Sequence, residues 1–103
     1  MTYGVIVTVT GPVESYDALH RELLKVTDPT SVEGLLVHVG RSVAGGFQVL
    51  EVWESKDQFD RYNRDVVWPL AAKVLADTPA PTEPVTEEFE VRGLVLPGHR
   101  VAT

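Results

Sequence analysis

The sequence predicts an α+β domain whose elements follow the order strand, helix, strand, strand, helix, strand. Residues 3–10 alternate β-branched side chains, which is typical of a strand. An apolar stripe at helical spacing follows between residues 16 and 26. Farther along, a strand-like run ends on Trp53 and passes at once into a second helical pattern. We therefore expect a four-stranded antiparallel sheet with helices packed against it, in one domain that covers residues 1–103.

The composition indicates a globular protein and excludes several classes of partner. The chain is 44% hydrophobic and 23% charged, with a net charge of −6, which argues against a nucleic-acid partner. It has no cysteine, so disulfides, thiolate nucleophiles and cysteine metal sites are excluded. The first residues lack the pattern of a signal peptide, and no apolar run approaches the roughly 20 residues of a membrane span. A cytoplasmic protein without a membrane partner is expected.

A clear stop separates the first strand from the first helix. Gly11 and Pro12 end the alternating run; glycine can cap the next helix, and proline suits its first turn. The helix is expected over residues 12–26. Its apolar stripe consists of Tyr16, Leu19, Leu23 and Val26.

The second and third strands are expected to form a hairpin. Their predicted ranges are 34–41 and 47–53, with a loop at 43–46 into which the strands could extend. Ser55 is a favourable N-cap for the helix that follows, and Gln58 three residues later completes a capping-box pattern.

The second helix carries a regular apolar stripe and one proline. Pro69 lacks a backbone N–H and clashes with the preceding turn, so we expect a kink or break near Trp68 and a second helical piece that ends near Asp77. Residues 78–84 include three prolines and predict an extended linker, before a fourth strand at 87–96. The stripe consists of Phe59, Tyr62, Val66, Leu70 and Val74.

Alternation along the strands assigns two faces to the predicted sheet. The face under the helices is expected to hold Val5, Val7, Val9, Leu35, Val37, Val39, Leu50, Val52, Phe89 and Val91. The opposite face is then mixed and holds Thr8, His38, Glu51, Trp53, Glu90 and Arg92 among aliphatic residues. A one-residue change of register would exchange the faces. A solvated outer face would explain the mixture, but its apolar members predict contact with a partner or ligand.

The run 49–56 (VLEVWESK), followed by Phe59 and Tyr62, resembles the dimeric α/β-barrel superfamily of ferredoxin-like proteins. The antibiotic biosynthesis monooxygenase and stress-responsive barrel branches are the most similar, over nearly the whole chain. The resemblance implies a ferredoxin-like βαββαβ fold. It also implies a homodimer in which two sheets form a barrel, with the mixed face lining an internal cavity.

The same resemblance implies action on a small apolar metabolite, aromatic or polyketide-like, with cofactor-independent monooxygenation as the leading chemistry. The substrate enolate or phenolate reduces oxygen itself, so the protein binds it, deprotonates it and excludes water. A polyketide cyclase or isomerase and a non-catalytic ligand-binding or stress-associated dimer are the alternatives. Haem degradation is not expected. The iron-binding histidine of that branch falls near Ala71 and Ala72, and its asparagine falls at Val7 and Thr8.

Six residues of the mixed face and second helix are the candidate site. A histidine ring ordinarily titrates near neutral pH, and a carboxylate at the position of Glu51 needs a partner such as His38 or Arg92. His38 and Glu51 are therefore the acid–base candidates. The substrate-binding candidates are Thr8, Trp53, Tyr62 and Arg92. Five of these residues also have a purely structural interpretation. His38 would be a half-buried, hydrogen-bonded histidine and Glu51 a paired carboxylate, Trp53 and Tyr62 would be core aromatics, and Arg92 would be a surface arginine.

No cofactor or metal site is predicted. His20 and His99 have no metal-ligand spacing with another histidine or carboxylate. The chain also carries no Ser–His–Asp signature, phosphate loop or dinucleotide fingerprint.

Overall fold

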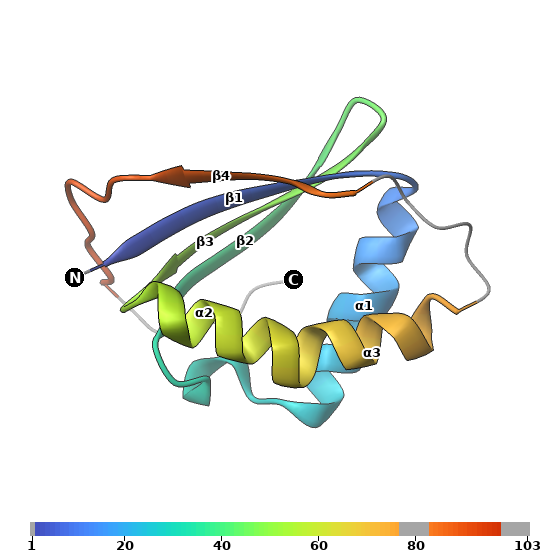
Figure 1. Ribbon diagram of the computed structural model, residues 1–103, viewed down its shortest axis with the longest axis horizontal. Coiled ribbons are helices and arrows are strands. Elements are labelled where there is room, and N and C mark those ends of the chain that lie inside the picture. The colour runs from blue at the N-terminus through green and yellow to red at the C-terminus, as the bar shows by residue number, and fades with distance from the viewer. Residues whose placement is uncertain (1, 77–82, 98–103) are drawn as a thin grey trace.

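The computed structural model describes residues 2–76 and 83–97 and confirms the predicted order of elements (Figure 1). The predicted linker at 78–84 lies mostly outside these residues, as does the predicted end of the second helix at Asp77. The strands are β1 (Tyr3–Thr10), β2 (Leu35–Val43), β3 (Gly46–Trp53) and β4 (Val85–Phe89). The helices are α1 (Val13–Val26), the 3₁₀ turn η1 (Pro29–Ser31), α2 (Lys56–Tyr62), the π-helical turn η2 (Asn63–Val67) and α3 (Trp68–Val74).

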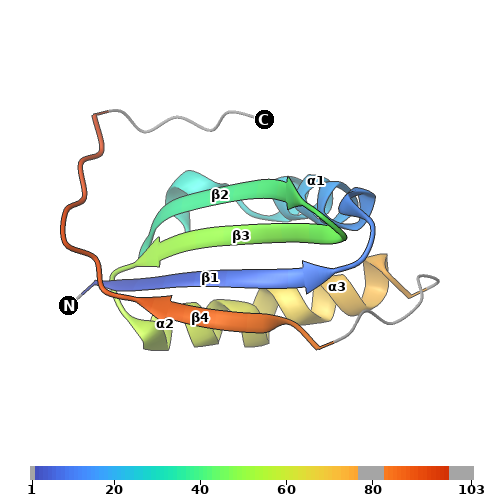
Figure 2. The ribbon, with the colours of Figure 1, turned by 90° about the horizontal axis from the view of Figure 1, so that it is seen from above.

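The four strands form one antiparallel sheet with the order β2-β3-β1-β4. Figure 1 shows the helices together on one face of this sheet, and the other face uncovered. Seen from above, α1 lies on the β2 side, and α2 and α3 lie on the β4 side (Figure 2). The predicted α+β, ferredoxin-like topology is confirmed. No helix in the described ranges is long and apolar enough to cross a membrane.

The hairpin and the last strand differ in length from the prediction. β2 and β3 both extend, leaving a tight turn in which Gly45 has φ +80°. β4 covers Val85–Phe89, so the predicted strand at 87–96 is wrong in its C-terminal half. The reason lies in β1, which pairs Gly4 with Phe89 and itself starts at Tyr3. By the same register, residues beyond Glu90 have no neighbouring strand.

Pro69 changes the second helix without breaking its course. Between α2 and α3 the backbone widens into η2, and Trp68 N–H donates to the Asn63 carbonyl, five residues back. Pro69 then occupies the first turn of α3, where its missing N–H does no harm. At the start of α2, Ser55 Oγ accepts a hydrogen bond from Gln58 N–H at 3.3 Å, which confirms the predicted cap.

The face assignments of β1 and of Leu35, which pairs with Trp53, are confirmed, but those of the rest of β2 and of β3 and β4 are wrong. β1 pairs Val5 with Glu51 and Tyr3 with Trp53, so Glu51 and Trp53 share the face of Val5. Trp53 and Val5 are fully buried. Both faces of β3 carry large apolar residues, so hydrophobicity alone could not choose between them. In β2 a bulge between Leu35 and Val37 shifts the alternation.

The correction moves the predicted polar residues to the interior. His38 pairs with Glu51 across β2 and β3, so both face the protein's own helices. In β4, Phe89 lies over Gly4 on the uncovered face, opposite to its predicted side. His38, Glu51 and Trp53 therefore lie between the sheet and the helices, and the expectation that these three residues line the interior of a barrel between two copies is wrong.

Candidate functional site

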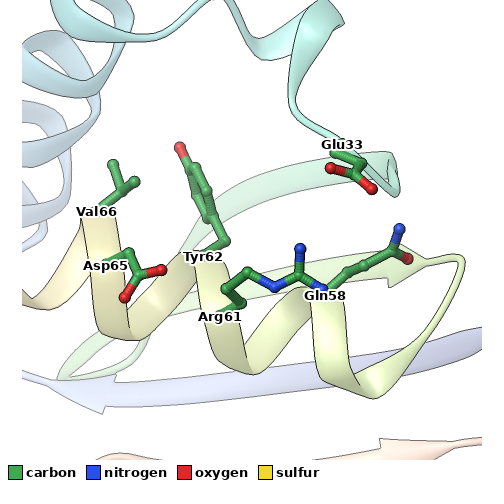
Figure 3. A pocket seen from close by; sticks show the side chains of 6 residues that line it. All are labelled: Glu33, Gln58, Arg61, Tyr62, Asp65 and Val66. Atoms are coloured by element: carbon green, nitrogen blue, oxygen red, sulfur yellow. The ribbon is translucent and has the colours of Figure 1, made fainter.

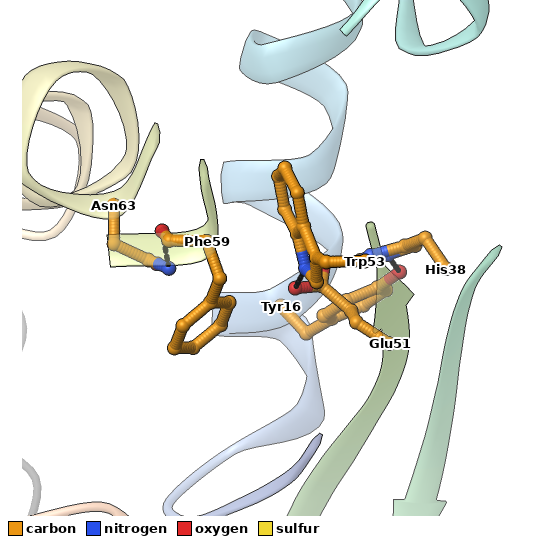
Figure 4. Close-up of polar contacts among 6 residues, drawn as sticks. All are labelled: Tyr16, His38, Glu51, Trp53, Phe59 and Asn63. Atoms are coloured by element: carbon orange, nitrogen blue, oxygen red, sulfur yellow. Dashed lines mark hydrogen bonds and ion pairs between the residues drawn. The ribbon is translucent and has the colours of Figure 1, made fainter. Parts of the chain in front are cut away.

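Four side chains form a continuous hydrogen-bonded chain between the sheet and α1 (Figure 4). Tyr16 Oη lies 2.9 Å from His38 Nε2, and His38 Nδ1 lies 2.6 Å from Glu51 Oε2. The other carboxylate oxygen, Oε1, accepts a hydrogen bond from Trp53 Nε1–H at 3.0 Å. We call these four residues the Tyr16–Trp53 chain. It contains both predicted acid–base residues and confirms that Glu51 is paired with His38.

Backbone register and one glycine position these side chains. His38 and Glu51 are direct cross-strand partners, and Trp53 follows Glu51 by two residues on the same face. Tyr16 reaches them from α1. A Cβ atom on Gly40 would overlap the Tyr16 ring, so glycine at this position lets the phenol lie flat on β2 beside His38.

The partners of Glu51 fix the direction of the hydrogen bonds. Glu51 receives donors at both oxygens, as an ionised carboxylate does. His38 then carries its proton on Nδ1 and leaves Nε2 as an acceptor for the Tyr16 hydroxyl, a tautomer assigned from the network. The His38 side chain is 27% exposed and that of Glu51 is 12% exposed, so His38 is the more exposed member of this pair.

Burial changes the acidity of the groups around His38. The pKa of Tyr16 is raised, first by burial and then by the charges of Glu51 and Asp17. Its phenol therefore stays protonated at neutral pH and can donate to His38. His20 lies one helical turn after Tyr16, with its ring stacked on both Tyr16 and His38 at 5.3 Å and 5.7 Å between centroids. Burial, followed by the charge of His38, lowers the pKa of His20.

Sequence reasoning missed Tyr16, His20 and Gly40. Tyr16 was assigned to the apolar stripe of the helix, and His20 was considered only as a metal ligand. One signal could have found them: Tyr16 and His20 are four residues apart and share a helix face, while His38 and Gly40 alternate on one strand face.

Aromatic side chains continue the interior on the other side of Trp53. Its ring lies 6.0 Å from that of Phe59 and 5.6 Å from that of Tyr62, both from α2. Asn63 fixes the end of α2 by donating from Nδ2 to the Phe59 carbonyl at 2.9 Å (Figure 4). The predicted neighbours Trp53 and Tyr62 therefore do meet, in a packed aromatic cluster.

Tyr62 also lines an open groove between α2 and the segment before β2 (Figure 3). Glu33 and Tyr62 come from opposite sides of this groove, Glu33 from the segment before β2 and Tyr62 from α2. Burial raises the pKa of Tyr62. The groove is lined by Glu33, Gln58, Arg61, Tyr62, Asp65 and Val66, and a second one beside α3 by Val26, Thr27, Asp65, Val66, Pro69, Leu70 and Lys73. Neither groove includes His38 or Glu51.

Two predicted binding residues lie away from the Tyr16–Trp53 chain. Thr8 is on the uncovered face, where its Oγ1 accepts a hydrogen bond from Gln48 at 3.1 Å. Arg92 lies beyond β4 with its side chain 86% exposed, 3.4 Å from Glu90. The structure therefore does not bring Thr8 or Arg92 to His38. In the described part of the chain, no cluster of three or more His, Cys, Asp or Glu residues could hold a metal ion.

The fold is shared with several solved structures. A candidate antibiotic biosynthesis monooxygenase from Caulobacter crescentus CB15 is 22% identical, with 89% of this chain and 91% of that chain covered and a TM-score of 0.64. A second candidate of the same description, from Chloroflexus aurantiacus, is 20% identical, covering 95% of this chain and 100% of that chain with a TM-score of 0.62.

A dimeric ferredoxin-like protein of unknown function from Thermobifida fusca is also similar. It is 16% identical, covers 88% of this chain and 92% of its own, and has a TM-score of 0.62. No family model and no curated protein matches the sequence. At these identities the similarity shows the fold, and it confirms the ferredoxin-like architecture that the resemblance implied.

Proposed function

We propose that this protein is a small cytoplasmic enzyme that removes a proton from an apolar, aromatic or polyketide-like metabolite and oxygenates it with O2, without a metal or organic cofactor. The observation that carries this proposal is the Tyr16–Trp53 chain. A phenol, an imidazole and a carboxylate are linked by hydrogen bonds of 2.9 Å and 2.6 Å at the edge of an otherwise aromatic interior. The description of the Caulobacter crescentus and Chloroflexus aurantiacus proteins as candidate monooxygenases supports the same chemistry.

In the proposed reaction, an acidic substrate proton passes to the Tyr16 oxygen while the Tyr16 proton passes to His38 Nε2. The substrate becomes an enolate or phenolate, and His38 becomes an imidazolium held beside the Glu51 carboxylate at 2.6 Å. A positioned base of this kind contributes about 10²- to 10⁴-fold to a rate. Glu51, itself held by Trp53 N–H, stabilises the imidazolium and fixes the ring orientation.

Oxygen then accepts electrons from the anionic substrate. A C–O bond forms at the activated ring carbon, and the peroxide takes the proton from His38. Loss of water from the hydroperoxide converts a ring CH2 group into a carbonyl. One atom of O2 stays in the product and the other leaves in water, so O2 is the only oxidant required. Trp53 and Tyr62 are the proposed apolar walls that keep bulk water from the anion.

A second candidate function is a non-catalytic dimer in which the Tyr16–Trp53 chain only holds α1 against the sheet. One feature of the packing favours this structural role over the enzyme. Trp53 is fully buried within the aromatic cluster, and neither groove reaches His38 or Glu51. An enzyme would need the substrate to approach through the exposed part of His38 or by displacement of a side chain.

Oxygen uptake with anthrone as the probe separates the two candidates. Anthrone carries an acidic ring CH2 group that lies across its central ring from a carbonyl. Loss of a proton from this CH2 gives a phenolate-type anion, which can react with O2 by the steps described above. We expect uptake by the unaltered protein to fall about 100-fold in His38→Gln and Tyr16→Phe, because each removes one proton-transfer group. Glu22→Gln, on an exposed part of α1, is the matched control and should keep the full rate.

Urea unfolding of the same variants completes the test. A catalytic role predicts loss of uptake in variants that remain folded. Uptake no faster than in buffer for the unaltered protein would reject the enzyme and leave the structural role. Equal rates in all four proteins would reject the proposed mechanism, because His38 and Tyr16 would then take no part in proton transfer.

A further inference from the structure

One titratable ring beside the Tyr16–Trp53 chain takes no part in the proposed proton transfer. His20 follows Tyr16 by one turn of α1, so the two side chains lie on the same face of the helix. The His20 ring centroid lies 5.3 Å from that of Tyr16 and 5.7 Å from that of His38, at interplanar angles of 13° and 2°. The rings of Tyr16 and His38 differ by 12°. We call Tyr16, His20 and His38 the three-ring cluster.

The three-ring cluster lies at an edge of the sheet. His38 belongs to β2, which is an edge strand, and α1 lies over that side of the sheet (Figure 2). All three residues of the cluster are half-buried. At the other end of the Tyr16–Trp53 chain, Trp53 is fully buried. Solvent therefore reaches the three-ring cluster, whereas it does not reach Trp53.

Packing from three elements keeps the phenol of Tyr16 in place within the cluster. Gly40 on β2 has no side chain, and a Cβ atom there would overlap the Tyr16 ring. The ring of Phe47 on β3 lies 5.6 Å from that of Tyr16, tilted by 53°. The hydrogen bond to His38 at 2.9 Å fixes the direction of the hydroxyl. The cluster is therefore organised before a ligand arrives, which lowers the cost of binding.

The cluster is suited to an apolar ligand rather than to an ion. Burial, followed by the charge of His38, lowers the pKa of His20, while Asp17 acts in the opposite direction. Burial also raises the pKa of Tyr16. Both rings are therefore uncharged at neutral pH. Uncharged aromatic rings prefer an offset-stacked aromatic neighbour, so the cluster favours a flat aromatic molecule.

We infer that the substrate binds at the edge between α1 and β2, as a planar aromatic molecule stacked on the three-ring cluster, and that His20 contacts it directly. The inference rests on the proposed function, which makes Tyr16 the group that receives the substrate proton. A ligand stacked on the phenol lies roughly 3.5 Å from its oxygen, which is the separation at which reacting groups meet. Neither of the two grooves includes a residue of the cluster.

Binding of anthrone under nitrogen tests this surface without turnover, because the oxidant is absent. NMR of histidine-labelled protein gives the dissociation constant. His20→Ala removes one ring, so we expect the dissociation constant to rise about 3- to 10-fold, the range for one aromatic pair. His20→Leu fills the space without a ring and should show the same rise, which keeps the test decisive if the alanine variant is unstable.

Two further variants serve as controls for the binding measurement. His20→Phe keeps a flat ring and should bind anthrone as the unaltered protein does. Arg21→Ala shortens an exposed side chain at the next position of α1, and no change is expected. Anthrone binding that is unchanged in His20→Ala and His20→Leu would overturn the inference, as would a failure of the unaltered protein to bind anthrone.

Oxygen uptake separates this inference from the proposed reaction. A ring that binds the substrate but moves no proton should raise KM in His20→Ala and leave kcat unchanged, and His20→Phe should restore KM. Binding that depends on His20 in a protein that takes up no oxygen would leave the binding surface and reject the oxygenation. Oxygen uptake with an unchanged KM in His20→Ala would reject the surface and leave the oxygenation.

Discussion

Gly40→Ala tests whether Tyr16 is held against β2 by close packing. The new methyl group would overlap the Tyr16 ring, and the phenol would have to move away from His38. Overpacking of this kind costs about 1–3 kcal/mol, and loss of the hydrogen bond to His38 adds about 1 kcal/mol. We therefore expect the free energy of unfolding in urea to fall by about 2–4 kcal/mol.

Gly93→Ala is the control for the glycine substitution itself. Nothing lies within 4 Å of a Cβ at Gly93, so only the unfolded chain is affected, and stability should change by less than about 1 kcal/mol. In a Tyr16→Leu background the ring is absent, and Gly40→Ala should then cost much less. Equal unfolding energies for Gly40→Ala and Gly93→Ala, or an unchanged cost in that background, would refute the close contact.

Three further outcomes are expected. Because burial raises the pKa of Tyr16, its phenol ionises at a lower pH in the unfolded chain than in the folded protein. The free energy of unfolding in urea should therefore fall as the pH rises above the ordinary value of 10.0, and it should fall less steeply in Tyr16→Phe. Equal pH dependence in the two proteins would contradict this. The pKa of His20 is lowered by burial and by His38, so on acidification His20 takes up a proton in the unfolded chain before it does so in the folded protein. The free energy of unfolding should therefore fall as the pH drops below 6.5, and His20→Gln should reduce this pH dependence. Ser55→Ala removes the cap of α2 and should lower the thermal midpoint, at a cost of about 1 kcal/mol, whereas Ser55→Asn should preserve it.

The order of elements could be predicted because local signals agreed at each boundary. Gly11 and Pro12 separate β1 from α1, and Ser55 with Gln58 begins α2. Pro69 was correctly placed as an interruption. The form it takes, a π-helical turn, depends on packing around the helix that periodicity does not contain.

The side of the sheet on which the site lies could not be predicted in the same way. Leu50 and Val52 are as apolar as Val49 and Trp53, so neither face of β3 stands out. The bulge at the start of β2 has no sequence marker of its own. The pairing of His38 with Glu51 was foreseen as one option because both assignments place them on the same face. The hydrogen bond from Tyr16 to His38 was not foreseen, because it depends on how α1 crosses β2.

The most direct test of the site is the protonation of His38 in the resting protein, read by ¹⁵N–¹H NMR of histidine-labelled samples. The hydrogen-bond geometry predicts a proton on Nδ1, directed at Glu51, and an unprotonated Nε2 whose nitrogen resonance shifts in Tyr16→Phe. A proton found on Nε2 with Nδ1 bare, or an Nε2 resonance that does not respond to Tyr16→Phe, would contradict the hydrogen-bonded chain on which the proposed chemistry depends.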